Sequence, residues 1–456
     1  MKKDNTIDFT SGGILKKFIT FVIPLIITGL LQVFFNAADL IVAGQFAGEK
    51  ALAAVGSTSS LINLILGLAI GLSVGANIVA AFFIGSNDRE LVKKTVDTAI
   101  AVALACGVVC MLVGIIGARF LLEFMDTPED VIDQAVAYFR TYFAGIPAAM
   151  IYNFCAAILR AAGESRKPLV YLSVSGVTNV ILNIIFITQL HMGAAGVGLA
   201  TAISQYLSAF LVVRDMMRTD EIYKFTPKSF KTDSGVLKRI LSVGVPSGIQ
   251  SMVFSFSNII IQSSINSFGS EVVAGSSAAS NIEGFAYIAM NAFSVAATTV
   301  VGQNVGAKKI KRIAKTIDEI GALVMAVGIV LGGLVYIFGE PLARLYCPDS
   351  DVAVEYAQIR LLYIAVPYFL CGLYEGLTGT LKACGYAITS MIIALVCCCG
   401  VRIVWIYTVF PIIGTIECIY ILYAITWILA VVACVLLYLF GARRNMAKKF
   451  ARVDIK

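Results

Sequence analysis

The chain has 456 residues, of which 59% are hydrophobic and 14% are charged, with a formal net charge of +7. Soluble domains carry about 25% charged residues, so this composition excludes an ordinary soluble protein. Because a helix needs about 20 predominantly apolar residues to cross a bilayer, the sequence predicts an all-α polytopic membrane protein. Its twelve predicted spans are 17–44, 54–85, 95–118, 133–159, 168–190, 196–216, 239–267, 273–303, 314–338, 352–381, 388–411 and 416–440.

The amino-terminal stretch "MKKDNTIDFTSGGILKKF" is polar and leads directly into the first span. It lacks the short apolar core and cleavage site of a signal peptide, so we expect the first span to be retained. With the amino terminus inside, most of the 35 Lys and Arg residues fall in cytoplasmic connections, whereas external connections collect acids, as in "EFMDTPEDVID" and "CPDSDVAVE". The positive-inside rule then places both termini in the cytoplasm of a multi-pass plasma-membrane protein, and it explains the basic excess without nucleic acid.

The two halves of the sequence form an internal repeat. "IPLIITGLLQVFFNAADL" matches "VPSGIQSMVFSFSNIII", "LRAAGES" matches "LKACGYA", and Pro147 matches Pro367, all at an offset of 220 to 222 residues. Six spans per unit start both units on the same side of the membrane, which predicts two pseudo-symmetric six-helix lobes related by an axis along the membrane normal. The predicted parts are the N-lobe 1–213, a cytoplasmic linker 214–235, the C-lobe 236–442 and a basic cytoplasmic tail 443–456.

A polar stripe in the N-lobe surrounds one acid. An Asp at the centre of a spanning helix costs roughly 2.5 to 3.5 kcal/mol, which usually marks a function. Polar side chains cannot face hydrocarbon, so we expect those of the N-lobe to converge. They are Gln32, Asn36 and Asp39 in the first span, Asn153, then Asn179 and Asn183, and finally Thr201 and Gln205. One carboxylate with carboxamide and hydroxyl oxygens suits a small hard cation such as Na+, and a proton is equally compatible.

The C-lobe carries its own polar residues. Asn258 and Gln262 lie on one face of the span 239–267, Glu283 lies one turn from Tyr287, and Glu375 lies in the span 352–381. Carboxylates beside aromatic rings suit a lipophilic cation, so we expect Glu283 to face a central substrate cavity. The alternative for Glu375 is an ion pair with Arg402, which the sequence suggests as the one basic residue clearly inside a span.

No pattern in the sequence supports catalysis. "GLAIGLSVGA" follows no predicted strand, so it indicates helix packing rather than phosphate binding. The eleven Cys lie mostly within apolar spans and, with a single His, form no metal pattern. We therefore expect a protein that is not an enzyme, that has no cofactor, and that takes its energy from an ion gradient.

Several stretches distributed over nearly the whole chain match one known family. They are "IPLIITGLLQVFFNAADLIVAGQFAGEKALAAVG", "LRAAGESRKP", "NVILNIIFI" with "GAAGVGLATAIS", and "VVGQNVGAKKIKR". By these stretches the chain resembles the MATE (multidrug and toxic compound extrusion) family of bacterial antiporters. The resemblance implies a coupling-cation site at Asp39, Asn179, Asn183 and Thr201, with Asn153 nearby.

Three positions depart from the family pattern. Many relatives have an acid at Asn183, some have a Tyr at Phe35, and others have a sodium-binding Glu at Phe254. The first departure leaves a single carboxylate in the N-lobe, and the last argues against a C-lobe sodium site of that type.

The resemblance implies a secondary active antiporter that exports organic, often cationic, compounds in exchange for Na+ or H+. Two lobes would rock about a midplane cavity. The residues expected to line it are Gln32, Phe35, Asn36, Asn153, Gln205, Asn258, Gln262, Glu283, Tyr287 and Glu375. The alternative is a lipid-linked saccharide flippase of the same superfamily. We expect a monomer whose partners are small organic substrates and the bilayer.

Overall fold

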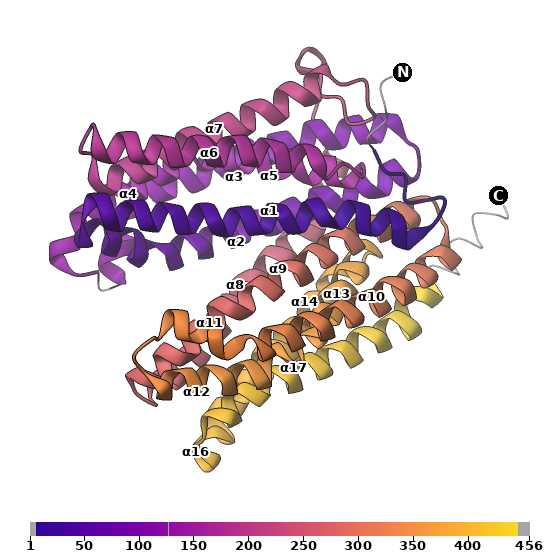
Figure 1. Ribbon diagram of the computed structural model, residues 1–456. Coiled ribbons are helices and arrows are strands. Elements are labelled where there is room, and N and C mark those ends of the chain that lie inside the picture. The colour runs from indigo at the N-terminus through magenta and orange to yellow at the C-terminus, as the bar shows by residue number, and fades with distance from the viewer. Residues whose placement is uncertain (1–5, 126, 446–456) are drawn as a thin grey trace. The chain divides into compact units, whose positions relative to one another are not determined.

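The computed structural model describes residues 6–125 and 127–445, and every regular element within them is helical (Figure 1). Inside a bilayer the backbone must satisfy its own hydrogen bonds, which explains the exclusive use of helices. By its contacts the chain divides into two compact units. Unit 1 comprises the described part of Met1–Asp8 and Ile23–Gly248, and unit 2 comprises Phe9–Val22 and the described part of Ile249–Lys456.

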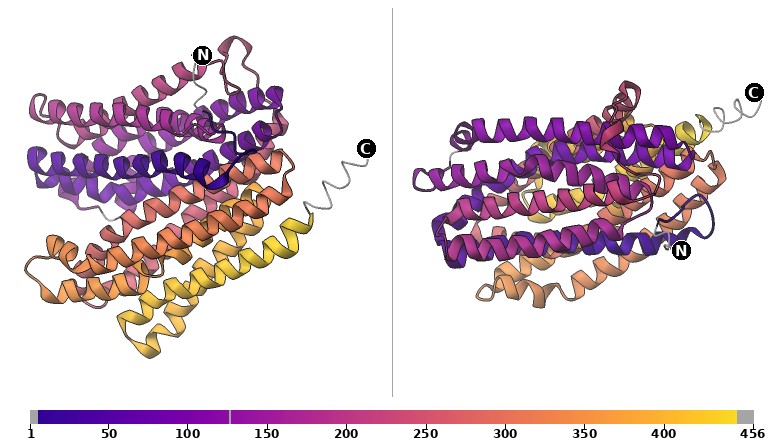
Figure 2. Two further views of the ribbon diagram at one scale, coloured as in Figure 1. Left: turned by 45° about the vertical axis from the view of Figure 1, so that its right-hand side comes forward. Right: turned by 90° about the horizontal axis from the view of Figure 1, so that it is seen from above.

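The first seven helices lie in the amino-terminal half, and the long ones run roughly side by side (Figure 2). They are α1 (Ile14–Val42), α2 (Glu49–Gly85), α3 (Arg89–Phe124), α4 (Glu129–Ala144), α5 (Ile146–Ala161), α6 (Arg166–Thr188) and α7 (Gly193–Arg218). The π-helical turn η1 (Ala43–Ala47) extends α1, and the short η2 (Pro227–Ser229) lies in the segment after α7.

The carboxyl-terminal half has more breaks in its helices. Its α-helices are α8 (Ser234–Asn266), α9 (Ser270–Gly306), α10 (Ile310–Ile337), α11 (Gly339–Tyr346), α12 (Asp351–Arg360), α13 (Tyr368–Ala383), α14 (Ala387–Ile393), α15 (Val401–Thr408), α16 (Phe410–Ile413) and α17 (Ile416–Leu436). Three π-helical turns join or extend them: η3 (Leu361–Ala365), η4 (Ala394–Gly400) and η5 (Leu437–Ala442). Of the predicted basic tail, only Arg443–Asn445 is described, and it continues the last helix.

Within residues 6–125 and 127–445, ten helical stretches are long and apolar enough to cross a membrane, and two bent pairs supply the remaining spans. The pairs are α4 with α5, bent by 44°, and α12 and η3 with α13, bent by 41°. Each bend lies beside a proline, Pro147 or Pro367, which removes a backbone donor at the break. Counting each pair as one span gives twelve and confirms the predicted number. The matching bends at matching repeat positions also agree with the duplication.

The glycine motif "GLAIGLSVGA" is a helix-packing motif, as predicted. A side chain at Gly71 would collide with the backbone of Gly248, and one at Gly75 would collide with Ile240 O and Gly244. The first half of α8 therefore packs backbone to backbone against α2 inside unit 1. Small residues spaced four apart on both helices permit this close approach, which drives helix association in membranes.

The predicted linker 214–235 is held against unit 1 rather than extended. Its first residues still belong to α7, which continues to Arg218. Further along, Lys231 N donates to Asp97 Oδ2 (3.1 Å) and Asp233 N donates to Thr98 Oγ1 (3.0 Å), both on α3. The linker thus passes along the first turns of α3 before α8 begins.

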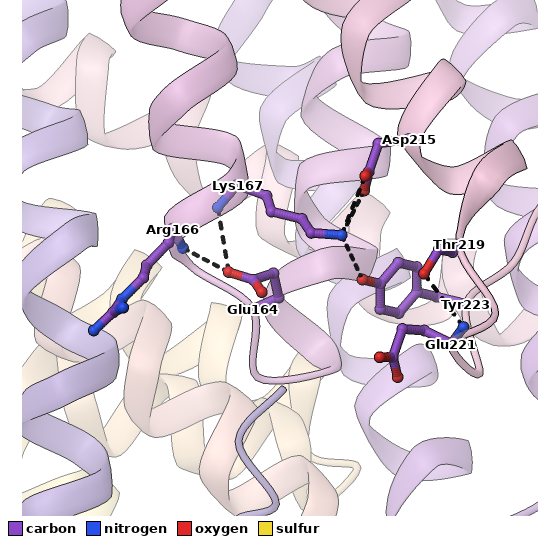
Figure 3. Close-up of polar contacts among 7 residues, drawn as sticks. All are labelled: Glu164, Arg166, Lys167, Asp215, Thr219, Glu221 and Tyr223. Atoms are coloured by element: carbon purple, nitrogen blue, oxygen red, sulfur yellow. Dashed lines mark hydrogen bonds and ion pairs between the residues drawn. The ribbon is translucent and has the colours of Figure 1, made fainter. Parts of the chain in front are cut away.

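The first turn of α6 is tied to the last turns of α7 by charge (Figure 3). Lys167 Nζ lies 2.8 Å from Asp215 Oδ2 and 3.3 Å from the hydroxyl of the fully buried Tyr223. Glu164 of the "LRAAGES" motif accepts from the backbone N–H groups of Arg166 (2.9 Å) and Lys167 (3.2 Å) and so caps α6. These contacts fix the register of α6 against α7, the two helices that carry most of the site residues.

The segment before α1 has a corresponding anchor in unit 2. Phe9 is buried; its N–H donates to Gln303 Oε1 (3.0 Å) and its carbonyl accepts from Arg312 Nε (2.9 Å). Asn304 Nδ2 donates to the same carbonyl at 3.2 Å. Residues of the stretch "VVGQNVGAKKIKR" therefore hold the backbone of Phe9, which precedes α1, by hydrogen bonds.

Candidate cation site

Asp39 lies in α1, one turn after Phe35, and is half-buried. The helix can approach α6 closely here because Gly176 has no side chain: a Cβ at that position would overlap the Phe35 ring. Phe35 thus occupies a notch in α6. This contact brings the carboxylate, one turn further along α1, next to the polar face of α6.

The structure brings together the four residues expected to bind a cation. Asn183 is fully buried, and its Nδ2 donates to Asp39 Oδ1 at 2.5 Å. The same Nδ2 lies 3.4 Å from the side-chain amide of Asn179, one turn earlier on α6. The Asn179 amide in turn lies 3.3 Å from Thr201 Oγ1 on α7. Three helices thus contribute one continuous hydrogen-bonded cluster.

The hydrogen bonds of the Asn179 amide are satisfied with its nitrogen toward the carboxylate. Its Nδ2 then donates to Asp39 Oδ1 at 2.8 Å, and its Oδ1 accepts from the backbone N–H of Thr201 at 3.2 Å. In this orientation both Asn179 and Asn183 donate to the carboxylate and stabilise its charged form.

The cluster also contains a further oxygen suited to a cation. Asn183 Oδ1 is buried and accepts no hydrogen bond from any described residue. A buried acceptor without a donor is costly, and positive charge nearby offsets that cost. Carboxylate, carboxamide and hydroxyl oxygens together form a hard donor set, which suits Na+ better than a transition metal.

The other predicted residues of unit 1 do not join this cluster through hydrogen bonds between side chains of the described chain. Gln32 and Asn36 are exposed on α1, on the helix face that leads to Asp39. Asn153 donates to Ala149 O of its own helix at 2.8 Å. Gln205 is half-buried on α7, one turn after Thr201.

The predicted residues of unit 2 are spread over several helices. Asn258, Gln262 and Tyr287 are exposed, and Gln262 Nε2 donates to Asn266 Oδ1 at 2.9 Å. Glu375 is half-buried on α13, and its backbone carbonyl accepts from Ser294 Oγ at 3.0 Å. These residues therefore form no second cluster comparable with that around Asp39 in the described part of unit 2.

Two expectations about charge in unit 2 are wrong. Arg402 forms no ion pair with Glu375 among the described residues; its Nε donates to Thr426 Oγ1 (3.3 Å) and its guanidinium lies 4.2 Å from the Tyr423 ring centroid. Arg402 is also not the one basic residue inside a span, because Arg360 is buried at the end of α12 and ion-paired with Glu283. Arg360 lies well inside the predicted span 352–381, ahead of Pro367, and this position could have identified it from the sequence as a basic residue within the membrane.

Comparison with known proteins gives the family. The MatE family model matches residues 24–185 and again residues 246–408, once in each half and over more than half of the chain. A probable multidrug resistance protein of Bacillus subtilis (strain 168), YpnP, is 29% identical over 390 residues, which cover 85% of this chain and 87% of that protein. The multidrug export protein MepA of Staphylococcus aureus (strain MSSA476) is 21% identical over 398 residues, or 87% of each chain.

Solved structures share the fold. A MATE transporter crystallised in the bent conformation superposes with a TM-score of 0.87 at 22% identity, covering 97% of this chain and 98% of that one. The duplicated family match, the two-unit helical fold and the relatives agree with one another. The chain therefore belongs to the MATE family of multidrug efflux transporters.

Proposed function

We propose that the protein is a secondary active antiporter that exports organic, often cationic, compounds in exchange for Na+ or H+, with Asp39 as the coupling carboxylate. The observation that carries the proposal is the Asp39 cluster: a carboxylate inside a spanning helix, hydrogen-bonded by Asn183 and ringed by carboxamide and hydroxyl oxygens. An isolated intramembrane carboxylate is costly to keep charged, so a mobile cation or proton is its natural partner.

Exchange follows from competition between two states of this cluster. With no cation bound, the amides of Asn183 and Asn179 donate to Asp39. When a cation or proton neutralises Asp39, these hydrogen bonds lose their charged acceptor and weaken, so the attachment of α1 to α6 changes. A bound cation that favours one conformation must lower affinity for a substrate that favours the other, and the coupling is reciprocal.

The substrate class and direction rest on similarity. The names of the relatives, multidrug resistance protein and multidrug export protein, support outward transport of chemically varied organic molecules and favour it over the flippase alternative. We further infer that both termini lie in the cytoplasm of the plasma membrane, because the basic connections gather on that side.

The decisive experiment is substrate efflux from proteoliposomes under an imposed sodium gradient and, separately, a pH gradient. Asp39→Asn should abolish gradient-driven efflux while the protein remains folded and monodisperse. Asp130→Asn is the matched control, because Asp130 is an exposed acid of the same half, 3.7 Å from Lys50. The gradient that drives wild-type efflux identifies the coupling ion. Undiminished efflux by Asp39→Asn would overturn the assignment of the site.

A further inference from the structure

Glu283 of α9 and Arg360 of α12 form a buried ion pair in unit 2. Arg360 Nη2 lies 2.5 Å from Glu283 Oε1, and the two side chains are 8% and 7% exposed. Among the ion pairs of the described residues, this one alone has both side chains less than a tenth exposed. It therefore differs in kind from the surface pairs, which contribute little to stability.

Further contacts hold the guanidinium in place. Arg360 Nη1 lies 2.8 Å from Ser276 Oγ, two turns before Glu283 on α9, and its Cζ lies 5.7 Å from the ring centroid of the buried Tyr420. Arg360 is the last residue of α12, directly before the η3 turn and the bend at Pro367. The pair thus fixes the end of α12 to α9 where the span changes direction.

The carboxylates Asp39 and Glu283 have opposite surroundings. Among the described residues, Asp39 has a neutral amide as its hydrogen-bonding partner and forms no ion pair, so its charge depends on a mobile cation. Glu283, in contrast, is ion-paired with the guanidinium of Arg360, a cation that belongs to the chain itself. Removing either member of a buried pair leaves an uncompensated charge, whereas replacing both can be nearly neutral.

We propose that Arg360 permanently neutralises Glu283. Glu283 is then not a coupling-ion site, and it neither binds nor releases a cation or proton during transport. The inference rests on the proposed antiport, because it says which carboxylate is left to exchange ions. It assigns Arg360 as a positioning residue, which keeps Glu283 neutralised and α12 docked on α9 throughout the cycle.

A charge-pair cycle tests this proposal. Arg360→Gln and Glu283→Gln should each lower the apparent melting temperature of the purified protein by about 5 °C or more. Each should also lower gradient-driven efflux at least about tenfold. The double variant, which carries no charge at either position, should recover more than half of the lost melting temperature and more than half of the lost efflux. Arg402→Gln is the matched control: it removes another buried arginine of the same half, and Glu283→Gln should not rescue it.

Each outcome has a defined meaning. A double variant that melts like wild type but transports no better than the single variants would show that the Glu283 charge is needed for transport, which overturns the proposal. A double variant that fails to fold overturns it too, because neutrality would then be insufficient. Recovery of the double variant when Arg360→Gln alone does not fold supports it. If wild type shows no gradient-driven efflux, the proposed function fails, and the melting temperatures still decide whether the pair is compensated.

Discussion

Substitution of Gly75 by Ala in α2 tests the packing of α2 against the first half of α8. A Cβ at Gly75 would collide with Ile240 O and lie 2.8 Å from Gly244 N. Both atoms belong to backbone and cannot rotate away, so the two helices must separate. Gly56, on the same helix, has no atom within 4 Å of the corresponding position and provides the matched control.

The expected magnitude follows from two opposing effects. Replacing a helical Gly by Ala stabilises the folded state by roughly 0.5 to 1 kcal/mol in both variants. At Gly75 the added methyl group also costs about 1 to 3 kcal/mol, the usual penalty for overpacking. The difference between the two variants isolates the steric penalty, so Gly75→Ala should be less stable than Gly56→Ala by about 1 to 3 kcal/mol.

The assay is thermal unfolding of both purified variants in one detergent, together with their gradient-driven efflux. We expect Gly56→Ala to match or exceed wild-type stability and Gly75→Ala to fall below it. Equal melting temperatures for the two variants would refute the close contact between α2 and α8.

Three further predictions concern the site and the linker. Asn183→Ala should lower the coupling-ion concentration for half-maximal efflux by about 10- to 100-fold, because it removes a hydrogen bond, about 1.5 to 3 kcal/mol, that stabilises the cation-free Asp39 carboxylate. Asn153→Ala, which loses a bond within its own helix, should change that concentration little, and equal effects of the two variants would contradict the site. The N–H of Val236 donates to Asp233 Oδ1 (3.0 Å) and lowers the pKa of Asp233. The stability contributed by the charged Asp233 is therefore present at neutral pH and lost as the pH falls through that lowered pKa. Asp233→Asn should flatten the dependence of melting temperature on pH, and an unchanged pH profile would exclude the contribution. Asp97→Ala should release the linker, so that trypsin cleaves native protein faster near residue 231; wild-type cleavage rates would show that the linker is held by other contacts.

Much of the fold follows from the sequence because the bilayer imposes strong rules. Apolar segments of sufficient length must be helical spans, and the constant offset between the halves predicts the duplication, including the matching bends at Pro147 and Pro367. The convergence of Asp39 with Asn179 and Asn183 follows from the same rule, since polar side chains one turn apart on a spanning helix must face other protein.

Only the tertiary structure decides which side chain of another helix meets each polar group. Helical spacing sets Glu283 one turn from Tyr287 but cannot show that Arg360, 77 residues later in the chain, is its ion-pair partner. Nor could it show that Arg402 lies over the Tyr423 ring instead of pairing with Glu375. The sequence by itself determined that Asp39 and Glu283 lie in spanning helices, because their segments are long and apolar. Only the packing of the helices determined that Glu283 has an ion-pair partner in the chain, whereas Asp39 forms no ion pair among the described residues.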